Sequence, residues 1–281
     1  MYYINLFQES HLRLNQHDTI ELPLGYSVLS RTRRPKASFE KSWGGVSIIY
    51  RSELKLKIHD DLSGPDFIVI QMGRILIYNV YIYPESTQWA GVFDKDPCEA
   101  LAASLALAFT ANFLIALLGD LNARTAELLA NMLDAARTSM DKESGSNPST
   151  RGRWLCRTFD DYKMAFVSGA QKFGPNSGRY TSFQGSRQTV IDYAVCSNAL
   201  FPDIASFWVD DKLDGYDHAA LTLNLKVNFD LQNMVFAKPH KRRKIDIVLP
   251  ETTELDRLLI TTLAAGKDVA KKLLALYGPI T

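Results

Sequence analysis

Carboxylate and histidine side chains occur in four short stretches that lie far apart in the chain. They are Glu9 to His11, Asp120 to Asn122, Asp192, and Asp217 with His218. Each stretch lies at the end of an apolar run that we expect to be a strand. Such a set supplies oxygen ligands for a hard cation such as Mg²⁺, and an Asp or His for the attacking water or the phosphate. Together the stretches predict metal-dependent hydrolysis of a phosphodiester.

Each of these residues also has a structural interpretation when it is taken alone. Glu9 would be an exposed residue after a strand, Asp120 with Asn122 an ordinary Asx turn, and His218 a core histidine. Asp192 is different, because a carboxylate inside an apolar strand is costly to bury without a partner. A histidine would be such a partner; the alternative is that Asp192 lies at the solvent face.

The elements that must position these residues are mostly strands. We expect strands over Tyr2–Phe7, Val46–Tyr50, Phe113–Leu118, Val190–Cys196 and Ala219–Val227, and a hairpin of Phe67–Gln71 with Arg74–Tyr81. An Ala-rich helix is expected to begin at Asp96-Pro97. Residues 141–153 are rich in Ser, Gly, Asn and charge, and are expected to form an exposed loop. Many strands with few helices predict an α+β architecture of packed sheets.

Length and composition allow one large domain with an extension. The chain has 281 residues, of which 46% are hydrophobic, and a formal net charge of +1. We place the main domain at residues 1–229 and the extension at 230–281, with a basic linker followed by an amphipathic helix over Glu254–Tyr277. The apolar run Ala100–Leu118 is interrupted at Thr110–Asn112, so no membrane span is expected.

The three cysteines are widely spaced, which fits neither a disulfide framework nor a zinc site. The first residues, Met1 to Phe7, have neither the basic start nor the small-residue cleavage site of a signal peptide. We therefore expect an intracellular protein, nuclear or cytoplasmic, rather than a secreted one.

In their order the motifs resemble a known family. The segment Tyr3–Leu12 resembles a strand ending in Gln-Glu-Thr-His, and Gly119–Ala123 resembles Gly-Asp-Phe-Asn-Ala. Val190–Tyr193 is similar to an Ile-Asp-Tyr strand, and Tyr216–His218 to a terminal Ser-Asp-His. The family is the endonuclease/exonuclease/phosphatase (DNase I-like) superfamily. Within it, the chain is most similar to the endonuclease domains of fungal non-LTR retrotransposons, because Arg151–Leu155 resembles their Arg-Gly-x-x-Leu helix.

This resemblance implies a fold and a role for each site residue. The fold would be a four-layered α/β sandwich, in which two mixed sheets are flanked by helices. Mg²⁺, or alternatively Mn²⁺, would be held by Glu9, Asp217 and Asp120. Asp120 would also activate the water and Asn122 would hold the phosphate. The remaining roles fall on His218 at the phosphate, Asp192 as its support, and Tyr81 as a phosphate contact with Tyr83 as a rival.

The implied activity is DNA nicking at the target site of a retroelement. The implied partners are DNA and a reverse transcriptase domain or element RNA. The chain departs from the family pattern where a strand carrying an Asn should precede Glu9, and where Tyr216 replaces Ser. We therefore expect the sheet to lack its first strand. This leaves two alternatives: an inactive, truncated remnant that at most binds nucleic acid, and a phosphatase of the same superfamily.

Overall fold

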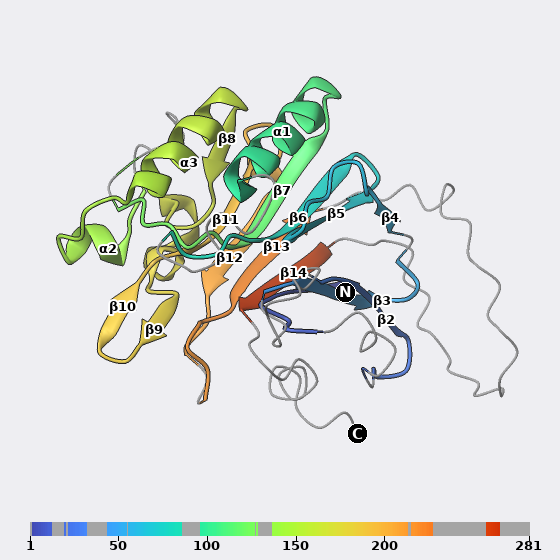
Figure 1. Ribbon diagram of the computed structural model, residues 1–281, viewed down its shortest axis with the longest axis horizontal. Coiled ribbons are helices and arrows are strands. Elements are labelled where there is room, and N and C mark those ends of the chain that lie inside the picture. The colour runs from blue at the N-terminus through green and yellow to red at the C-terminus, as the bar shows by residue number, and fades with distance from the viewer. Residues whose placement is uncertain are drawn as a thin grey trace, which may run out of the picture.

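The protein, represented here by a computed structural model, folds as two β-sheets packed face to face (Figure 1). The structure describes residues 2–12, 20, 22–32, 44–54, 56–85, 96–126, 128, 137–212, 215–226 and 257–264. In order across the first sheet, the strands are β12 (Ile204–Val209), β13 (Leu221–Lys226), β14 (Arg257–Ala264), β1 (Tyr2–Gln8), β3 (Val46–Arg51) and β2 (Tyr26–Arg31). Across the second, they are β4 (Lys57–Ile58), β5 (Phe67–Met72), β6 (Ile75–Tyr81), β7 (Leu114–Asp120), β11 (Asp192–Ser197) and β8 (Met164–Phe166).

The remaining elements are a small hairpin and several helices. The hairpin pairs β9 (Ser182–Gln184) with β10 (Arg187–Thr189). The helices are α1 (Pro97–Thr110), α2 (Met140–Glu143) and α3 (Thr150–Asp161), with 3-10 turns η3 (Gln171–Phe173), η4 (Pro175–Gly178) and η5 (Phe201–Asp203). Each large sheet is mixed, because β1 runs parallel to β14 and β6 runs parallel to β7, while the other pairs are antiparallel. The predicted α+β class is confirmed.

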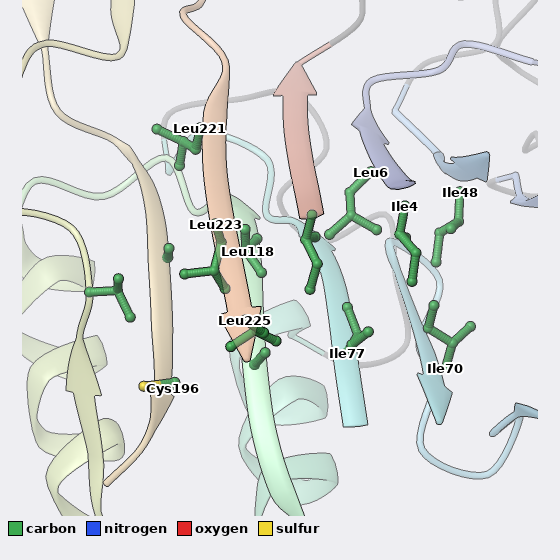
Figure 2. Packing of buried hydrophobic residues seen from close by; sticks show 14 of the residues in the cluster. Ile4, Leu6, Ile48, Ile70, Ile77, Leu118, Cys196, Leu221, Leu223 and Leu225 are labelled. Atoms are coloured by element: carbon green, nitrogen blue, oxygen red, sulfur yellow. The ribbon is translucent and has the colours of Figure 1, made fainter. Parts of the chain in front are cut away.

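The main core lies between the two sheets. Ile4 and Ile48 from the first sheet face Ile70, Ile77 and Leu118 from the second (Figure 2). Strand side chains alternate between faces, so neighbouring residues of one buried strand serve two cores. In β6, Ile77 points into the main core, while the preceding Leu76 packs in the second core beneath the helices. Both faces of β6 are therefore buried against apolar side chains, which explains why its sequence is an almost continuous apolar run.

Helices α1 and α3 cover the outer face of the second sheet. The side chain of Asp96 caps α1 by accepting a hydrogen bond from the Cys98 amide at 2.7 Å, as the sequence predicts. The side chain of Ser149 caps α3 in the same way, accepting from the Gly152 amide at 3.0 Å. The second sheet therefore gains its helical layer from two well-capped helices.

The prediction of an exposed loop over residues 141–153 is wrong. Helix α3 begins at Thr150, and the side chain of Asp141 is fully buried. The Asp141 carboxylate accepts a hydrogen bond from the Val190 amide at 3.2 Å, so a long-range contact buries a residue whose neighbours are polar. No helix in the described part of the chain is long and apolar enough to cross a membrane.

The C-terminal extension contributes a strand, β14, to the first sheet. Residues 257–264 form a strand, so the predicted helix over Glu254–Tyr277 is wrong for this segment. The strand lies between β13 and β1, with Gln8 of β1 opposite Ala264 and Leu223 of β13 opposite Ile260. Ile260 is fully buried in the main core.

The position beside β1 that was expected to be empty is thus filled. The first sheet contains strands from before and after the expected domain boundary at residue 229, because β13 ends at Lys226 and β14 begins at Arg257. The predicted basic linker lies in residues 227–256, outside the described residues. The physical reason is hydrogen bonding, because two interior strand edges without a partner would leave buried amide and carbonyl groups unpaired.

Candidate active site

The ends of three neighbouring strands bring the predicted residues to one edge of the second sheet. In the register of β6, β7 and β11, Tyr81 lies opposite Asp120, and Asp120 lies opposite Asp192. Strand β7 lies between β6 and β11 in the sheet, so Asp120 is at the centre of this row. The buried run of β7 ends at Asp120, so this carboxylate lies where the strand reaches the edge of the sheet.

Glu9 reaches the same edge from the other sheet. It follows β1 directly, and a buried amide network fixes β1 against β6. The Gln8 side chain donates to the Asn79 side-chain oxygen at 2.5 Å, and Asn79 donates to the main-chain oxygens of Phe7 and Ser47 at 3.2 and 2.9 Å. All of these polar groups lie between the sheets. Asn79 therefore aligns the end of β1 with the end of β6, a function that its sequence motif alone does not reveal.

Tyr81 contacts Glu9 across this junction, because its hydroxyl donates a short hydrogen bond to the Glu9 carboxylate. The second Glu9 oxygen lies 3.8 Å from Nε2 of His11. Burial would raise the pKa of Glu9, but the hydrogen bonds from His11 and Tyr81 and the charges of His11 and His218 lower it below its usual value. Sequence reasoning missed His11, whose only signal was its place two residues after Glu9.

Asp192 and His218 form a buried pair. Nδ1 of His218 lies 2.8 and 3.0 Å from the two Asp192 carboxylate oxygens, and both residues are at most 5% exposed. Thr181 holds this arrangement, since its hydroxyl accepts from the Asp192 amide at 3.0 Å and its carbonyl accepts from the Ala219 amide at 2.8 Å. Burial would lower the pKa of His218, but the negative charge and hydrogen bond of Asp192 raise it to about 10.

Asn122 is bound to Asp120. Its backbone amide and its side-chain amide each donate to a different Asp120 oxygen at 2.8 Å, and the side chain also donates to the Ile82 carbonyl at 2.9 Å. Asn122 has φ 45°, in the left-handed region that Asn tolerates better than most residues. Its amide hydrogens are used within the protein, so Asn122 holds the Asp120 carboxylate in place. The predicted contact with phosphate stays a prediction.

The pKa of Asp120 is raised well above its usual value by burial and by the nearby negative charges of Asp192 and Glu9, which outweigh the charge of His218. Among the described residues, the ligand atoms of Asp120, Asp192 and His218 all lie within 4.8 Å of one another. Glu9 and Asp217 do not join a group of that tightness, and Asp217 is exposed. The expected ligand set of Glu9, Asp217 and Asp120 is therefore not gathered as closely as the group that contains Asp192.

A divalent cation nevertheless fits this donor set. The carboxylate oxygens are hard ligands, and Mg²⁺ commonly takes only one or two protein carboxylates and keeps several waters. The charges of Asp192 and Glu9 oppose ionisation of Asp120, and a bound cation would offset that repulsion. Tyr83, the rival to Tyr81, lies elsewhere: its carbonyl accepts from the Arg151 side chain, and it lines a cavity with Trp154.

Comparison with known proteins identifies the fold. No protein-family model matches the chain, and no curated protein matches it in sequence. Among solved structures, a 3'-5' exonuclease from Neisseria meningitidis matches with a TM-score of 0.53 and 18% identity over 77% of this chain and 86% of that one. An AP endonuclease from Leishmania major matches with a TM-score of 0.55 and 13% identity over 77% and 76%.

The endonuclease domain of TRAS1, a telomere-specific non-LTR retrotransposon, is also similar. Its TM-score is 0.51 with 13% identity, over 80% of this chain and 98% of that domain. The chain therefore has the DNase I-like fold of exonucleases, AP endonucleases and a retrotransposon endonuclease domain.

Proposed function

We propose that this protein is a divalent-metal-dependent DNA endonuclease that nicks DNA for a retroelement. The observation that carries the proposal is the buried group of Asp120, Asp192 and His218, flanked by Glu9 and Tyr81, at one edge of a DNase I-like sandwich. A buried histidine with its own carboxylate, beside a second carboxylate, is a costly arrangement that phosphodiester chemistry explains.

In this proposal Glu9 and Asp120 hold Mg²⁺ or Mn²⁺, with Asp217 at the exposed rim. The cation, when bound, neutralises charge on the phosphoryl oxygens. Tyr81 holds the Glu9 carboxylate through its hydroxyl, which is a positioning role in place of the predicted phosphate contact. Asn122 holds the Asp120 carboxylate, which accepts a hydrogen bond from the attacking water and orients it.

The histidine supplies positive charge. Because Asp192 accepts the hydrogen bond from Nδ1 of His218, the second ring nitrogen Nε2 is left to donate to an oxygen of the scissile phosphate. With its pKa raised to about 10, His218 is positively charged at neutral pH. It therefore stabilises the negative charge that develops on the phosphate as the bond to the leaving oxygen breaks.

The retroelement assignment is supported by two observations. The chain spans 98% of the TRAS1 endonuclease domain in the structural comparison, and the Arg151–Leu155 motif lies on α3. On this basis we propose DNA as the substrate and a reverse transcriptase domain or element RNA as a partner, in the nucleus or the cytoplasm. The missing strand motivated the alternative of an inactive remnant, and β14 now covers that edge of β1.

The experiment is a nicking assay. Purified protein should convert supercoiled plasmid to open circles in Mg²⁺ or Mn²⁺ but not in EDTA. Asp120→Ala and His218→Ala should each lower the rate by about 10²-fold or more, the usual contribution of a positioned acid or base. Asp203→Asn is the control, because Asp203 is exposed in η5, which follows the end of β11 opposite to Asp192.

The proposal fails if the folded wild-type protein does not nick DNA in the presence of either Mg²⁺ or Mn²⁺. The same preparations should be offered an oligonucleotide with a 3'-phosphate, because one similar structure is a Neisseria 3' phosphatase bound to a DNA hairpin. Release of phosphate without nicking would identify the protein as a phosphatase of the same fold.

A further inference from the structure

A buried arginine binds the segment of residues 121–126, which follows β7. Arg137 is only 7% exposed, and each of its guanidinium nitrogens donates a hydrogen bond. Nε donates to the Ser168 carbonyl at 3.0 Å, Nη1 to the Leu128 carbonyl at 2.9 Å, and Nη2 to the Thr125 hydroxyl at 2.9 Å. Because a guanidinium can only donate, it makes the Thr125 hydroxyl an acceptor.

This bond from Arg137 sets the direction of the hydrogen bonds that follow. The Thr125 hydroxyl passes its own proton to the Tyr193 hydroxyl oxygen at 3.2 Å, and the Thr125 amide donates to the same oxygen at 3.2 Å. The proton of the Tyr193 hydroxyl serves the carbonyls of Val190 at 2.6 Å and Ala123 at 2.9 Å. Thr125 and Tyr193 are fully buried. The Tyr193 hydroxyl therefore uses its donor and both of its acceptor positions within the protein.

The two carbonyls bound by this hydroxyl belong to segments that carry the site. Ala123 directly follows Asn122, and Val190 lies two residues before the start of β11. On the other side of Asn122, the Leu121 amide donates to the Ile191 carbonyl at 3.0 Å. Asn122 is therefore held from both sides against the segment that leads into β11.

Asn122 requires this support because of its backbone conformation. It has φ 45°, and Ala126 has the same value, in the left-handed region. Residues with side chains adopt this region rarely, and it persists only where the surrounding contacts determine it. The Asn122 backbone amide and side-chain amide each donate to an oxygen of Asp120 at 2.8 Å. The position of the Asp120 carboxylate thus depends on the conformation of the residues around Thr125.

We propose that Tyr193 is a positioning residue for the reaction at Asp120. Because Tyr193 is fully buried, it acts through Asn122 and not on the substrate. Arg137 and Thr125 fix the direction in which its hydroxyl binds. Without the hydroxyl, the segment relaxes towards common backbone angles, and the amides that hold the Asp120 carboxylate move. The inference deepens the proposed function and rests on it for the identity of the reaction.

The chain offers a matched control, Tyr78→Phe. Tyr78 and Tyr193 are both fully buried in the second sheet, and burial raises the pKa of each to about 12, so both hydroxyls keep their protons. The Tyr78 hydroxyl lies 3.1 Å from the Ser104 hydroxyl on α1 instead. Each Phe variant therefore removes one buried hydroxyl and lowers the Tm, but only Tyr193→Phe releases the segment beside the site.

Hydrogen exchange, measured by NMR in EDTA without DNA, tests the positioning directly. We expect the Asn122 amide, which donates to Asp120, to exchange about tenfold or more faster in Tyr193→Phe than in wild type. The Leu117 amide within β7 is the internal reference for a general loss of stability. In Tyr78→Phe the ratio of the two exchange rates should stay within about twofold of the wild-type ratio.

Nicking kinetics test the consequence for the reaction. We expect kcat of Tyr193→Phe to fall about tenfold while KM changes less than about twofold, because the carboxylate is misplaced and the DNA-binding surface is not. Thr125→Val removes the hydroxyl that connects Arg137 to Tyr193 and should lower kcat comparably. The double variant should be within about twofold of the slower single variant, since both changes break one connection. Tyr78→Phe should keep the wild-type kcat.

The inference is overturned if exchange at Asn122 rises no more in Tyr193→Phe than in Tyr78→Phe. It is also overturned if these two variants nick at the same rate, or if the losses from Thr125→Val and Tyr193→Phe multiply in the double variant. Hydrogen exchange needs no turnover, so it decides the inference by itself. A wild-type protein that does not nick would remove the proposed nuclease function alone.

Discussion

Substituting Gly119 by alanine tests how much the close contact between β6 and β7, next to Asp120, contributes to stability. A Cβ atom at Gly119 would lie 1.9 Å from the Val80 carbonyl oxygen, and the residue has φ 150°. Gly119 and Val80 are partners in the parallel pair, so the strands would have to separate at the centre of the sheet. Forced overpacking costs about 1–3 kcal/mol, and the backbone conformation adds about 1 kcal/mol more.

We therefore expect Gly119→Ala to lower the free energy of unfolding by about 3 kcal/mol, which corresponds to a Tm about 6–12 °C lower for a domain of this size. Differential scanning calorimetry measures it. The control is Gly73→Ala, where φ is 58° and nothing lies within 4 Å of the added Cβ, so that only backbone strain of about 1 kcal/mol remains. Equal Tm values for the two variants would refute the argument from the Val80 contact.

Other properties of the structure give three further predictions. Ile260→Asp should lower the free energy of unfolding by about 3–5 kcal/mol, because it buries an unpaired charge in β14. The control Ile58→Asp, at a residue 42% exposed, should change it little. Equal effects of the two variants in urea titrations would mean that β14 is not held in the core. Burial raises the pKa of Cys98 to about 12 from 9.0, so its thiolate is about 10³-fold rarer at pH 8 and Ellman's reagent should modify it slowly until guanidinium is added. Because the pKa of His218 is raised from 6.5 to about 10, its charged form contributes fully to stability below pH 6.5, and this contribution is lost as the pH rises to 10. The Tm difference between wild type and His218→Gln, measured in EDTA, should therefore shrink over that range. A constant difference would contradict the pairing of His218 with Asp192.

Local sequence patterns predicted the elements that carry the site. The short apolar run before Gly119 is typical of a buried strand, and the Asp and Asn that follow form an Asx turn. Asp192 was expected to require a partner because it lies in an apolar strand, and the structure places His218 against it. These inferences depend on burial and periodicity, which neighbouring residues in the sequence already determine.

Long-range contacts decided the rest. The segment Arg257–Ala264 contains leucines that suit a helix as well as a strand, and its neighbours are rich in Ala and Lys. It becomes a strand because β1 and β13 both have free hydrogen-bonding edges and Ile260 enters the core between them. The intrinsic preference of these residues for helix contributes less free energy than burial in the core and pairing with two strands. The local sequence therefore predicted a helix where the protein forms a strand.

The same division holds within the site. The sequence by itself determined which residue types could carry phosphodiester chemistry and which strands deliver them. Only the tertiary structure decided that the Asn122 side chain also binds Asp120, that Tyr81 and His11 contact Glu9, and that Asn79 aligns the two sheets. The physical reason is that strand register and sheet packing set these distances, and both depend on residues far apart in the chain.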